Sequence, residues 1–471
     1  MKTKAKSLGV QIATLIVVAI LIIVALTVAP PAGLEPAGWS CLILVVCAFL
    51  LWLTGALPIP ITCLLLIAGF YYLKVMTTKE IFAASCSNAV FFLLAGFGIG
   101  EALVQTNVAY IILRAIVKWA GRSSKKIIAG FVILTAIISL IVSNGTAAII
   151  VAGIGVTVMT ALGNPEPGSH KMLKGIMIGI IYGAMAGGLA SPASNSLNVT
   201  ITDLMTTSTG VEIGFLEWCK IGVPATILLT AFTAFILPKV INPDPLSDED
   251  FARFQTIFDG IPDKLQAKDI KFLIIIGVLI VLWVSSNWVK SINVTMTAIL
   301  GLAVMFLPGV NILTGKQYLK SVKPLGLILL LCIVPLATGM KNTGAGEWLV
   351  NLLFGGAMGA PKMVIYFLIT LVALIIHLMV PSGSGNAALS ATLMFPVAVQ
   401  SGISCCAVLL ILAMQCGNNF LMPIEGIYTY TMAYDHYTFG DVVKAGWPIT
   451  LFEFVLCVLL IPALAAVFGM A

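Results

Sequence analysis

Charged residues are scarce in this chain of 471 residues: they make up 9% of it, whereas hydrophobic residues make up 60%. The mean hydropathy is +1.10, far above that of soluble domains. Apolar runs near the length that crosses a bilayer recur along the whole sequence. We therefore expect an all-α integral membrane protein. The net charge of +6 is ordinary for such a protein and gives no argument for nucleic acid as a partner.

Metal-binding and catalytic patterns are missing as well. The ten cysteines contain no CxxC pair, and the three histidines, His170, His377 and His436, are too dispersed for a metal site. We recognise no Ser/His/Asp set and no nucleotide-binding segment. The sequence therefore argues against an enzyme and against an ATP-driven pump, and it predicts no metal centre or organic cofactor.

About eleven membrane-spanning helices can be counted, and several apolar runs are too short to span alone, which indicates interrupted helices. The first run, Leu8 to Val28, follows Lys2, Lys4 and Lys6 but lacks a small-residue cleavage pattern. We interpret it as a signal anchor, and the positive-inside rule places the amino terminus in the cytoplasm. We expect the protein in a bacterial plasma membrane, surrounded by the lipid bilayer.

The chain repeats itself on either side of a hydrophilic stretch. "FLEWCKIGVP" (215–224) matches "FGDVVKAGWP" (439–448), with Phe, Lys, Gly and Pro at equal spacing. The polar break "VSNGTAA" (142–148) has its partner in "VPSGSGNAA" (380–388). An odd number of crossings in each part would make the repeats inverted, and we favour that arrangement.

The two polar breaks predict a binding site within the membrane. Broken backbone is tolerated at that depth only where it is buried in protein or lines a cavity, and paired breaks are the best sequence pointer to a transporter's binding site. A guanidinium clamp for carboxylates is not evident, because none of the three arginines lies in a confidently buried segment. Two facing helix N-termini would favour a small anion with a negative group at each end. The same breaks offer oxygen ligands that suit Na⁺ as a coupling ion.

These residues resemble a known family. "SNGTA" (143–147) resembles the Ser-Asn-Thr signature, and "GGLASPASNSLN" (187–198) the Gly-Gly-rich segment, of the divalent anion/sodium symporter family, which includes INDY-type dicarboxylate carriers and citrate/dicarboxylate translocators. "CGNNFLMPIEGIYTYTMAYDHYTFGDVVKAGW" (416–447) is similar to its closing signature, and "HLMVPSGSGNAAL" (377–389) to the translocators' His and Ser-x-Thr. The resemblance covers roughly residue 79 to the end. It implies a homodimer in which a transport domain with two re-entrant hairpins moves past a scaffold domain as an elevator.

The resemblance implies a division of the chain and a set of site residues. The predicted ranges are scaffold helices in 1–78, transport elements of the first repeat in 79–241, a hydrophilic cytoplasmic linker in 242–271, scaffold helices of the second repeat in 272–308 and its transport elements in 309–471. The predicted substrate-binding residues are Ser143, Asn144, Gly145, Thr146, Asn195, Ser382, Gly383, Ser384, Asn386, Pro423 and Gly426. The residues predicted for a cation or for coupling are Ser139, Ser194, His377 and Glu425.

Three departures from the family pattern shape the predicted function. Gly145 stands where the family has Thr, Gly383 stands where sodium-coupled members have Asn, and Glu425 brings a carboxylate into a loop that is usually neutral. They favour a secondary transporter that exchanges C4/C5 dicarboxylates of the succinate, malate, fumarate and 2-oxoglutarate type. Sodium-coupled symport of di- or tricarboxylates is the alternative. A cation/proton antiporter is disfavoured, because it would ask for buried acidic pairs that Glu425 alone does not provide.

Overall fold

The computed structural model describes residues 8–355, 359–379, 383–423 and 425–470, and every regular element in these ranges is a helix. Five helical stretches are long and apolar enough to cross a bilayer, and shorter apolar helices of 10–17 residues accompany them in the described part. The five are Leu8–Thr27, Thr78–Val104, Asn144–Ala161, Phe215–Ile241 and Phe439–Val467. The prediction of an all-α membrane protein is confirmed.

The first part of the chain contains, in order, α1 (Leu8–Thr27), α2 (Pro36–Thr54), α3 (Ile59–Tyr72), α4 (Thr78–Ser85), α5 (Asn88–Val104), α6 (Val108–Ala120), α7 (Ser124–Ser139), α8 (Asn144–Ala161), α9 (Lys171–Gly187), the 3₁₀ turn η1 (Pro192–Ser194), α10 (Ser196–Thr209) and α11 (Phe215–Ile241). The hydrophilic stretch that follows holds α12 (Asp248–Gln255) and η2 (Thr256–Phe258).

The second part contains α13 (Ala267–Ser285), α14 (Val294–Val304), α15 (Gly315–Ser321), α16 (Pro324–Asn342), α17 (Ala345–Phe354), α18 (Lys362–Met379), α19 (Gly383–Ser401), α20 (Cys405–Gly417), η4 (Gly426–Tyr428), α21 (Thr429–Met432), α22 (Phe439–Val455), the π-helical turn η5 (Leu456–Leu460) and α23 (Ile461–Val467). Helix α13 thus begins inside the range predicted for the linker.

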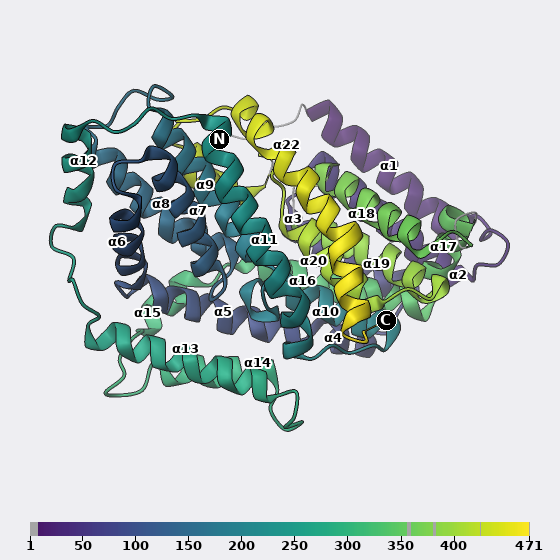
Figure 1. Ribbon diagram of the computed structural model, residues 1–471. Coiled ribbons are helices and arrows are strands. Elements are labelled where there is room, and N and C mark those ends of the chain that lie inside the picture. The colour runs from purple at the N-terminus through teal and green to yellow at the C-terminus, as the bar shows by residue number, and fades with distance from the viewer. Residues whose placement is uncertain (1–7, 356–358, 380–382, 424, 471) are drawn as a thin grey trace.

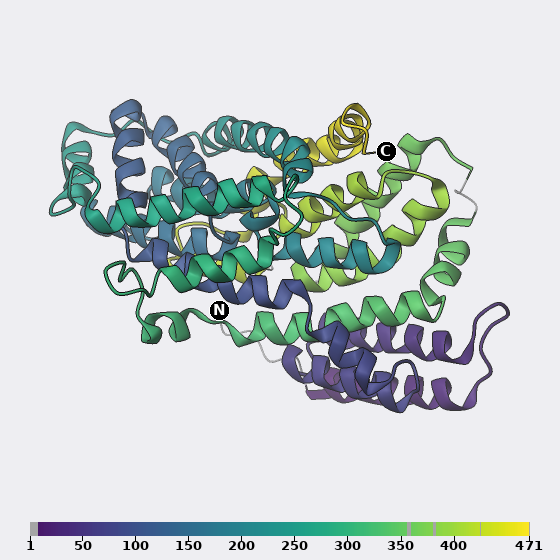
Figure 2. The same cartoon turned by 90° about the horizontal axis from the view of Figure 1, so that it is seen from below.

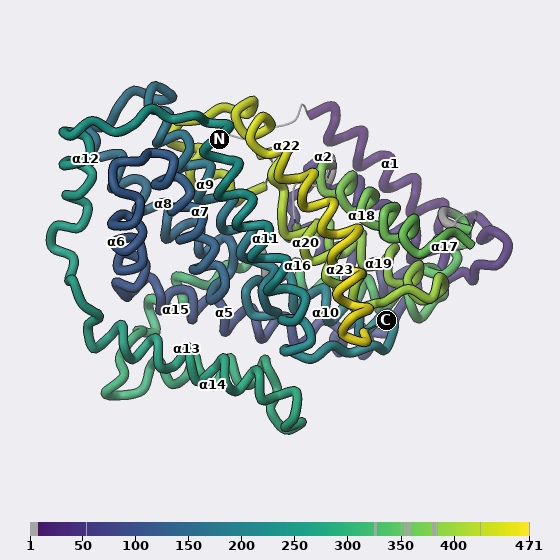
Figure 3. The backbone as a smooth tube through the Cα atoms, viewed as in Figure 1, coloured from purple at the N-terminus to yellow at the C-terminus, as the bar shows by residue number. Residues whose placement is uncertain are grey.

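The helices form two groups on either side of the packed pair α11 and α22. Helices α6 to α9 lie on one side of the molecule and α17 to α19 on the other, with α11 and α22 between them (Figure 3). Helices α1, α2 and α3 lie together beside α16 (Figure 2), and α16 contacts both α2 and α3.

Helices α11 and α22 are the matched elements of the sequence repeat. They pack against each other and run in opposite directions (Figure 1). Both begin in the same way: Glu217 accepts a hydrogen bond from the N–H of Gly214 at 2.8 Å, and Asp441 accepts one from the N–H of Thr438 at 2.8 Å. A carboxylate in the first turn satisfies a free N–H of the helix start. Matched helices of opposite direction are what inverted repeats require.

A short turn joins two helices ahead of each break. Helix α5 is joined to α6 by residues 105–107, and α16 is joined to α17 by residues 343–344, where the φ of Gly344 is 67° and favours glycine. The first turn is held by another helix, because the N–H of Asn107 donates to Asp269 Oδ1 of α13 at 2.9 Å. The re-entrant hairpins that the family resemblance implies stay a prediction.

Close backbone packing positions the first break. Helix α9 lies against α7, and a Cβ on Gly183 would come within 2.3 Å of the carbonyl oxygen of Val132. Small residues let two helices approach in this way inside a membrane. Because α7 ends at Ser139, its last turn is fixed against the end of α9.

Candidate functional site

The first break lies between α7 and α8, at the predicted residues. Ser143 is the N-cap of α8: its Oγ accepts the N–H of Thr146 at 3.4 Å and lies 3.0 Å from Thr146 Oγ1. A Ser at this position satisfies one of the free N–H groups of the first turn and leaves the others available. Gly145, in that turn, faces open space: a Cβ there would meet only Tyr430 Oη, at 4.0 Å. The break therefore presents a helix N-terminus with free donors.

Three oxygen atoms meet beside this break. Ser139 Oγ lies 3.0 Å from Asn144 Oδ1 and 2.8 Å from the carbonyl oxygen of Ala184 on α9. Ser139 and Asn144 are both buried. The Asn144 amide can reach this position because residue 188 is a glycine. A Cβ on Gly188 would lie within 2.2 Å of Asn144 Oδ1. The oxygens are hard, uncharged ligands of the kind that coordinates Na⁺ at broken helices.

The loop after α9 closes on itself and presents one amide to the centre. Ser194 Oγ lies 2.9 Å from the carbonyl oxygen of Gly188 and 2.7 Å from that of Ser191. Ser194 therefore holds its own loop and makes no hydrogen bond to Ser139 among the described residues. Asn195 caps α10 by accepting the N–H of Leu197 at 3.2 Å. The predicted coupling role of Ser194 stays a prediction.

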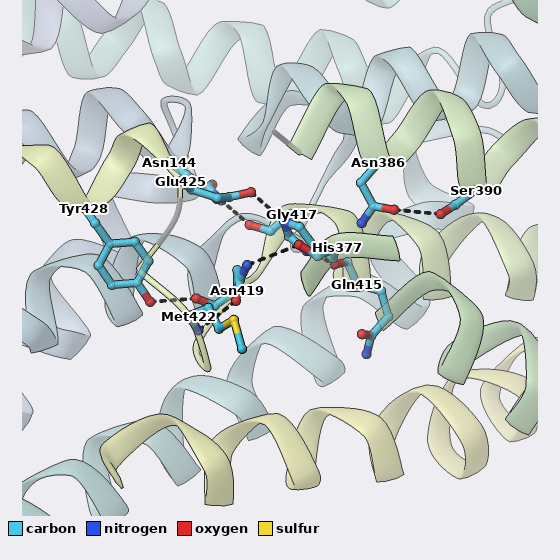
Figure 4. Close-up of polar contacts among 10 residues, drawn as sticks. All are labelled: Asn144, His377, Asn386, Ser390, Gln415, Gly417, Asn419, Met422, Glu425 and Tyr428. Carbon is cyan, nitrogen blue, oxygen red and sulfur yellow. Dashed lines mark hydrogen bonds and ion pairs between the residues drawn. The ribbon is translucent and has the colours of Figure 1, made fainter. Parts of the chain in front are cut away.

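The end of α20 joins the two breaks. Asn144 Nδ2 donates to the carbonyl oxygen of Gly417 at 3.4 Å, so the first break contacts the second part of the chain (Figure 4). Asn195 Nδ2 lies 3.7 Å from where a Cβ on Gly417 would stand. From the other side, a Cβ on Gly383 would come within 2.6 Å of the carbonyl oxygen of Cys416. The starts of α8 and α19 thus meet across Cys416 and Gly417.

A histidine and a glutamate pair at the second break. His377 Nε2 lies 2.5 Å from Glu425 Oε1, and His377 Nδ1 lies 2.5 Å from the carbonyl oxygen of Gln415 (Figure 4). The side chain of His377 is 1% exposed and that of Glu425 13%. Glu425 Oε1 is also 3.5 Å from the Cβ position of Gly383. The carboxylate therefore fills the space beside the glycine that replaces the family's Asn.

The start of α19 carries a buried donor without a partner. Asn386 Oδ1 accepts a hydrogen bond from Ser390 Oγ at 2.7 Å, whereas Asn386 Nδ2 has no partner among the described residues, although the residue is fully buried (Figure 4). A buried polar group without a partner is costly, so an unfilled donor here points to a ligand. Of the remaining predicted residues, Ser382 lies outside the described residues, and only the backbone of Ser384 is described. Pro423 is half-buried in the loop, and Gly426 opens η4 at the surface.

Sequence reasoning missed a second buried carboxylate. Glu453 of α22 is 1% exposed, and its Oε1 accepts a hydrogen bond from Asn418 Nδ2 at 2.8 Å. Gln415 lies in the same region: its Nε2 is 3.5 Å from Cys457 Sγ, and its Oε1 has no partner among the described residues. A lone Glu inside the apolar run "WPITLFEFVLCVLL" (447–460) was the available signal, because an intramembrane ionisable residue is by default a candidate for function.

Two tyrosines hold the loop that carries Glu425. Tyr182 Oη of α9 lies 2.8 Å from the carbonyl oxygen of Phe420 and 2.9 Å from that of Val442, and Tyr428 Oη donates to the carbonyl oxygen of Asn419 at 2.6 Å. Both rings are buried. The loop is unwound but has partners for its carbonyls, as irregular backbone at membrane depth requires.

The arginines take no part in this arrangement. Each pairs with an acid at an exposed position near the linker, and the pairs are Arg114 with Asp263 at 2.6 Å, Arg122 with Asp248 at 2.6 Å and Arg253 with Glu249 at 2.5 Å. The site therefore has no guanidinium clamp. Helix N-termini and neutral amides are the groups that the described breaks offer to an anion.

A polar cavity of about 600 Å³ lies away from the breaks. Its lining includes Asn88, Asp203, Thr206 and Glu212. Asp203 already accepts the N–H of Ala89 at 2.9 Å, which caps the start of α5. Two carboxylates would repel a dianion, so we do not assign substrate binding to this cavity.

Comparison with known proteins places the chain in a family. A family model described as "Citrate transporter" (CitMHS) matches residues 49–417. The sodium-dependent dicarboxylate transporter SdcS of Staphylococcus saprophyticus is 28% identical over 235 residues, which are 48% of this chain and 45% of that protein. SdcS of Staphylococcus aureus strain USA300 is 26% identical over 195 residues, 40% of this chain and 38% of that protein. The matches thus span less than half the length of these relatives.

Two solved structures share the fold. The YdaH transporter of Alcanivorax borkumensis aligns with 98% of this chain and 97% of its own at a TM-score of 0.60 and 14% identity. MtrF of Neisseria gonorrhoeae, described as illuminating a class of antimetabolite efflux pumps, aligns with 96% of this chain and 94% of its own at a TM-score of 0.61 and 14% identity. The architecture is that of an integral membrane transporter. Because the family model covers most of its length, the chain belongs to the citrate transporter family, a family of membrane transporters and not of enzymes.

Proposed function

We propose that this chain is a sodium-coupled carrier of citrate and of C4/C5 dicarboxylates. The observation that carries the proposal is the meeting of two helix N-termini, those of α8 and α19, across Cys416 and Gly417. The start of α8 offers N–H donors, and both helix starts present the positive end of a helix dipole. Asn386 Nδ2 adds a buried donor that has no partner among the described residues. Together they suit an anion with a carboxylate at each end.

The proposed sodium site is the oxygen cluster of Ser139, Asn144 and Ala184. A cation there would sit beside the start of α8 and would offset part of the cost of bringing a dianion to membrane depth. The relatives named sodium-dependent transporters support sodium coupling over the anion exchange that the sequence predicts. The substrate-binding roles of Ser143, Thr146 and Asn195 are part of this proposal.

Anion exchange is the second candidate, and the second break favours it. Gly383 supplies no side-chain oxygen, and Glu425 is occupied by His377. A carbonyl oxygen can only accept, so His377 Nδ1 must donate to Gln415, and His377 Nε2 faces Glu425 Oε1 at 2.5 Å. The described residues of the second break therefore offer no cation site comparable to the first.

The proposed mechanism follows the family resemblance. Residues 1–78 and 272–308 would form the scaffold, and residues 79–241 and 309–471 the moving transport elements, in a homodimer with an elevator motion. The opposite directions of α11 and α22 support the inverted arrangement on which such a motion depends.

Transport by the purified protein in liposomes tests the function. Labelled succinate and labelled citrate are offered with an inward sodium gradient, with choline in its place, and with unlabelled acid inside. Uptake that needs external sodium and ignores internal acid supports symport. Uptake that needs internal acid and ignores sodium selects exchange. Absence of uptake of both acids under every gradient contradicts the carrier assignment.

A pair of variants tests the sodium site. Ser139→Ala removes one of the three oxygens, so we expect the sodium concentration for half-maximal uptake to rise at least about fivefold, the loss of roughly 1 kcal/mol. Thr135→Ala is the matched control one turn earlier on α7, because Thr135 Oγ1 donates to its own helix at the carbonyl oxygen of Phe131. An equal sodium dependence in both variants would remove the case for this site.

A further inference from the structure

Gly145 leaves room for a ligand on one side of the first break. On the side of α5 and α13, the cavity at Ser143 measures only about 20 Å³, enough for a water molecule but not for a carboxylate. On the other side, a Cβ on Gly145 would find no atom nearer than Tyr430 Oη at 4.0 Å. Gly145, which stands where the resembling family has Thr, thus leaves the start of α8 without a side chain on the side of α21, and α8 and α21 contact each other.

A lysine lies at the far edge of this space. Lys323, the residue before α16, donates from Nζ to Tyr430 Oη at 3.3 Å, and its Nζ also lies 5.6 Å from the centre of the Tyr430 ring. Because Tyr430 Oη accepts this hydrogen bond, its own proton stays available to a ligand. The order in space is therefore the start of α8, the gap at Gly145, the phenol of Tyr430 and the ammonium of Lys323.

The ammonium of Lys323 is available to an anion. Among the described residues no carboxylate lies within ion-pair distance of it, whereas Lys174 pairs with Asp441 at 2.9 Å. Lys323 is exposed, which lets its charged end swing toward the gap, and Tyr430 is only half-buried. A ligand whose first carboxylate binds the N–H groups of α8 would bring a further negative group toward this phenol and ammonium.

We propose that Lys323 and Tyr430, facing Gly145, form a subsite for the third carboxylate of a tricarboxylate such as citrate. The inference rests on the proposed function, in which the two breaks bind the two carboxylates that dicarboxylates and tricarboxylates share. A dicarboxylate has no group for the subsite, so Lys323 sets the preference between the two classes. Tyr430 provides one hydrogen bond to the third carboxylate, and Lys323 adds a charge-assisted one.

Uptake of labelled citrate and labelled succinate by the same proteoliposomes tests the subsite. In Lys323→Gln the ratio of citrate to succinate uptake is expected to fall by roughly tenfold, the loss of one charge-assisted hydrogen bond. Lys323→Arg keeps the charge and should keep the ratio within about threefold, and Tyr430→Phe should lower it less than Lys323→Gln does. Lys320→Gln is the matched control, because Lys320 is an exposed lysine three residues earlier, on α15.

The outcomes separate this inference from the function on which it rests. A wild-type protein that carries both acids and a Lys323→Gln protein with an unchanged ratio would overturn the subsite and leave the carrier intact. An equal fall in Lys320→Gln would assign the effect to general surface charge and would also overturn it. A wild-type protein that carries succinate alone overturns the subsite, and one that carries neither acid overturns the proposed function as well.

Discussion

His377 Nε2 lies 2.5 Å from Glu425 Oε1 and thereby ties the end of α18 to the loop after α20. Its other nitrogen reaches the carbonyl oxygen of Gln415 on α20. In the first part of the chain Ser139 makes the equivalent connection, from the end of α7 to the carbonyl oxygen of Ala184 on α9. The helix before each break is thus fixed to the second helix after it in the chain: a hydroxyl joins α7 to α9, and an imidazole joins α18 to α20.

Removing Glu425 should loosen the second break. Glu425→Ala leaves the buried Nε2 of His377 without its partner, so we expect a loss of about 1–3 kcal/mol of stability together with most of the uptake. Glu425→Gln keeps an acceptor at the same place and should recover most of the stability. Thermal unfolding in detergent and uptake of labelled succinate check both effects.

Glu217→Gln serves as the control for this comparison, because Glu217 accepts the N–H of Gly214 at an exposed helix start. It should leave uptake within about twofold of the wild type, since exposed caps contribute roughly 1 kcal/mol. A Glu425→Ala protein as stable as the wild type would show that the pair with His377 does not hold the loop.

Restoring the family residue at Gly383 should not restore a sodium site. In Gly383→Asn the new Cβ would come within 2.6 Å of the carbonyl oxygen of Cys416, which is backbone and cannot move aside. We expect a loss of about 1–3 kcal/mol from overpacking and a lower yield of folded protein. Thermal unfolding measures this, and sodium-dependent uptake is compared in the same sample. A stable protein with a steeper sodium dependence would contradict the expectation.

The sequence predicted the fold well because the fold depends on regular patterns. Apolar runs, the match of 215–224 with 439–448 and the polar breaks are all local, and the structure has helices, matched caps and breaks at these places. Ser139 was predicted for a cation and Asn144 for the substrate; the two side chains are in contact, and their roles stay predictions. The predicted function was less successful, because Gly383 and Glu425 were given more weight than the relatives' sodium dependence supports.

The contacts that sequence could not predict join distant parts of the chain. Glu453 pairs with Asn418 of the loop after α20, and Lys323 reaches Tyr430 from the start of α16. Which side chains meet in such pairs depends on how α16, α20 and α22 pack, and helical periodicity gives only the face of each helix. The single Glu in its apolar run could have been named as a candidate, but its partner could not.

Two glycine substitutions should act in opposite directions. Gly183→Ala places a Cβ within 2.3 Å of the carbonyl oxygen of Val132 and should force α7 and α9 apart, at a cost of about 1–3 kcal/mol. Gly153→Ala on α8 has no atom within 4 Å of the new Cβ and should add roughly 0.5–1 kcal/mol, because alanine is the better helix former. Thermal unfolding of both variants in one detergent measures the difference. Equal shifts would show that the contact between α7 and α9 can relax.

Stability should fall as the pH falls below the usual pKa of histidine. His170, just before α9, and His436, between α21 and α22, lie outside the membrane-spanning helices. Burial lowers the pKa of both: for His170 it outweighs the raising effects of Asp250 and Asp244, and for His436 the neighbouring His170 adds to it while Asp435 opposes it. Their Nδ1 atoms are buried and have no partner among the described residues.

A lowered pKa in the folded state means that the unfolded chain binds protons more readily. These histidines therefore cost the folded protein no stability at about pH 8, where both are neutral in the folded and in the unfolded state. Stability is lost as the pH falls through about 6.5 and below. We expect the melting temperature of the double variant His170→Gln/His436→Gln to depend less on pH between about 7 and 5.5 than that of the wild type. Thermal unfolding across this range tests it. The two proteins should unfold with similar pH dependence near pH ~8, and parallel curves down to pH ~5.5 would show that these histidines are not the groups that titrate.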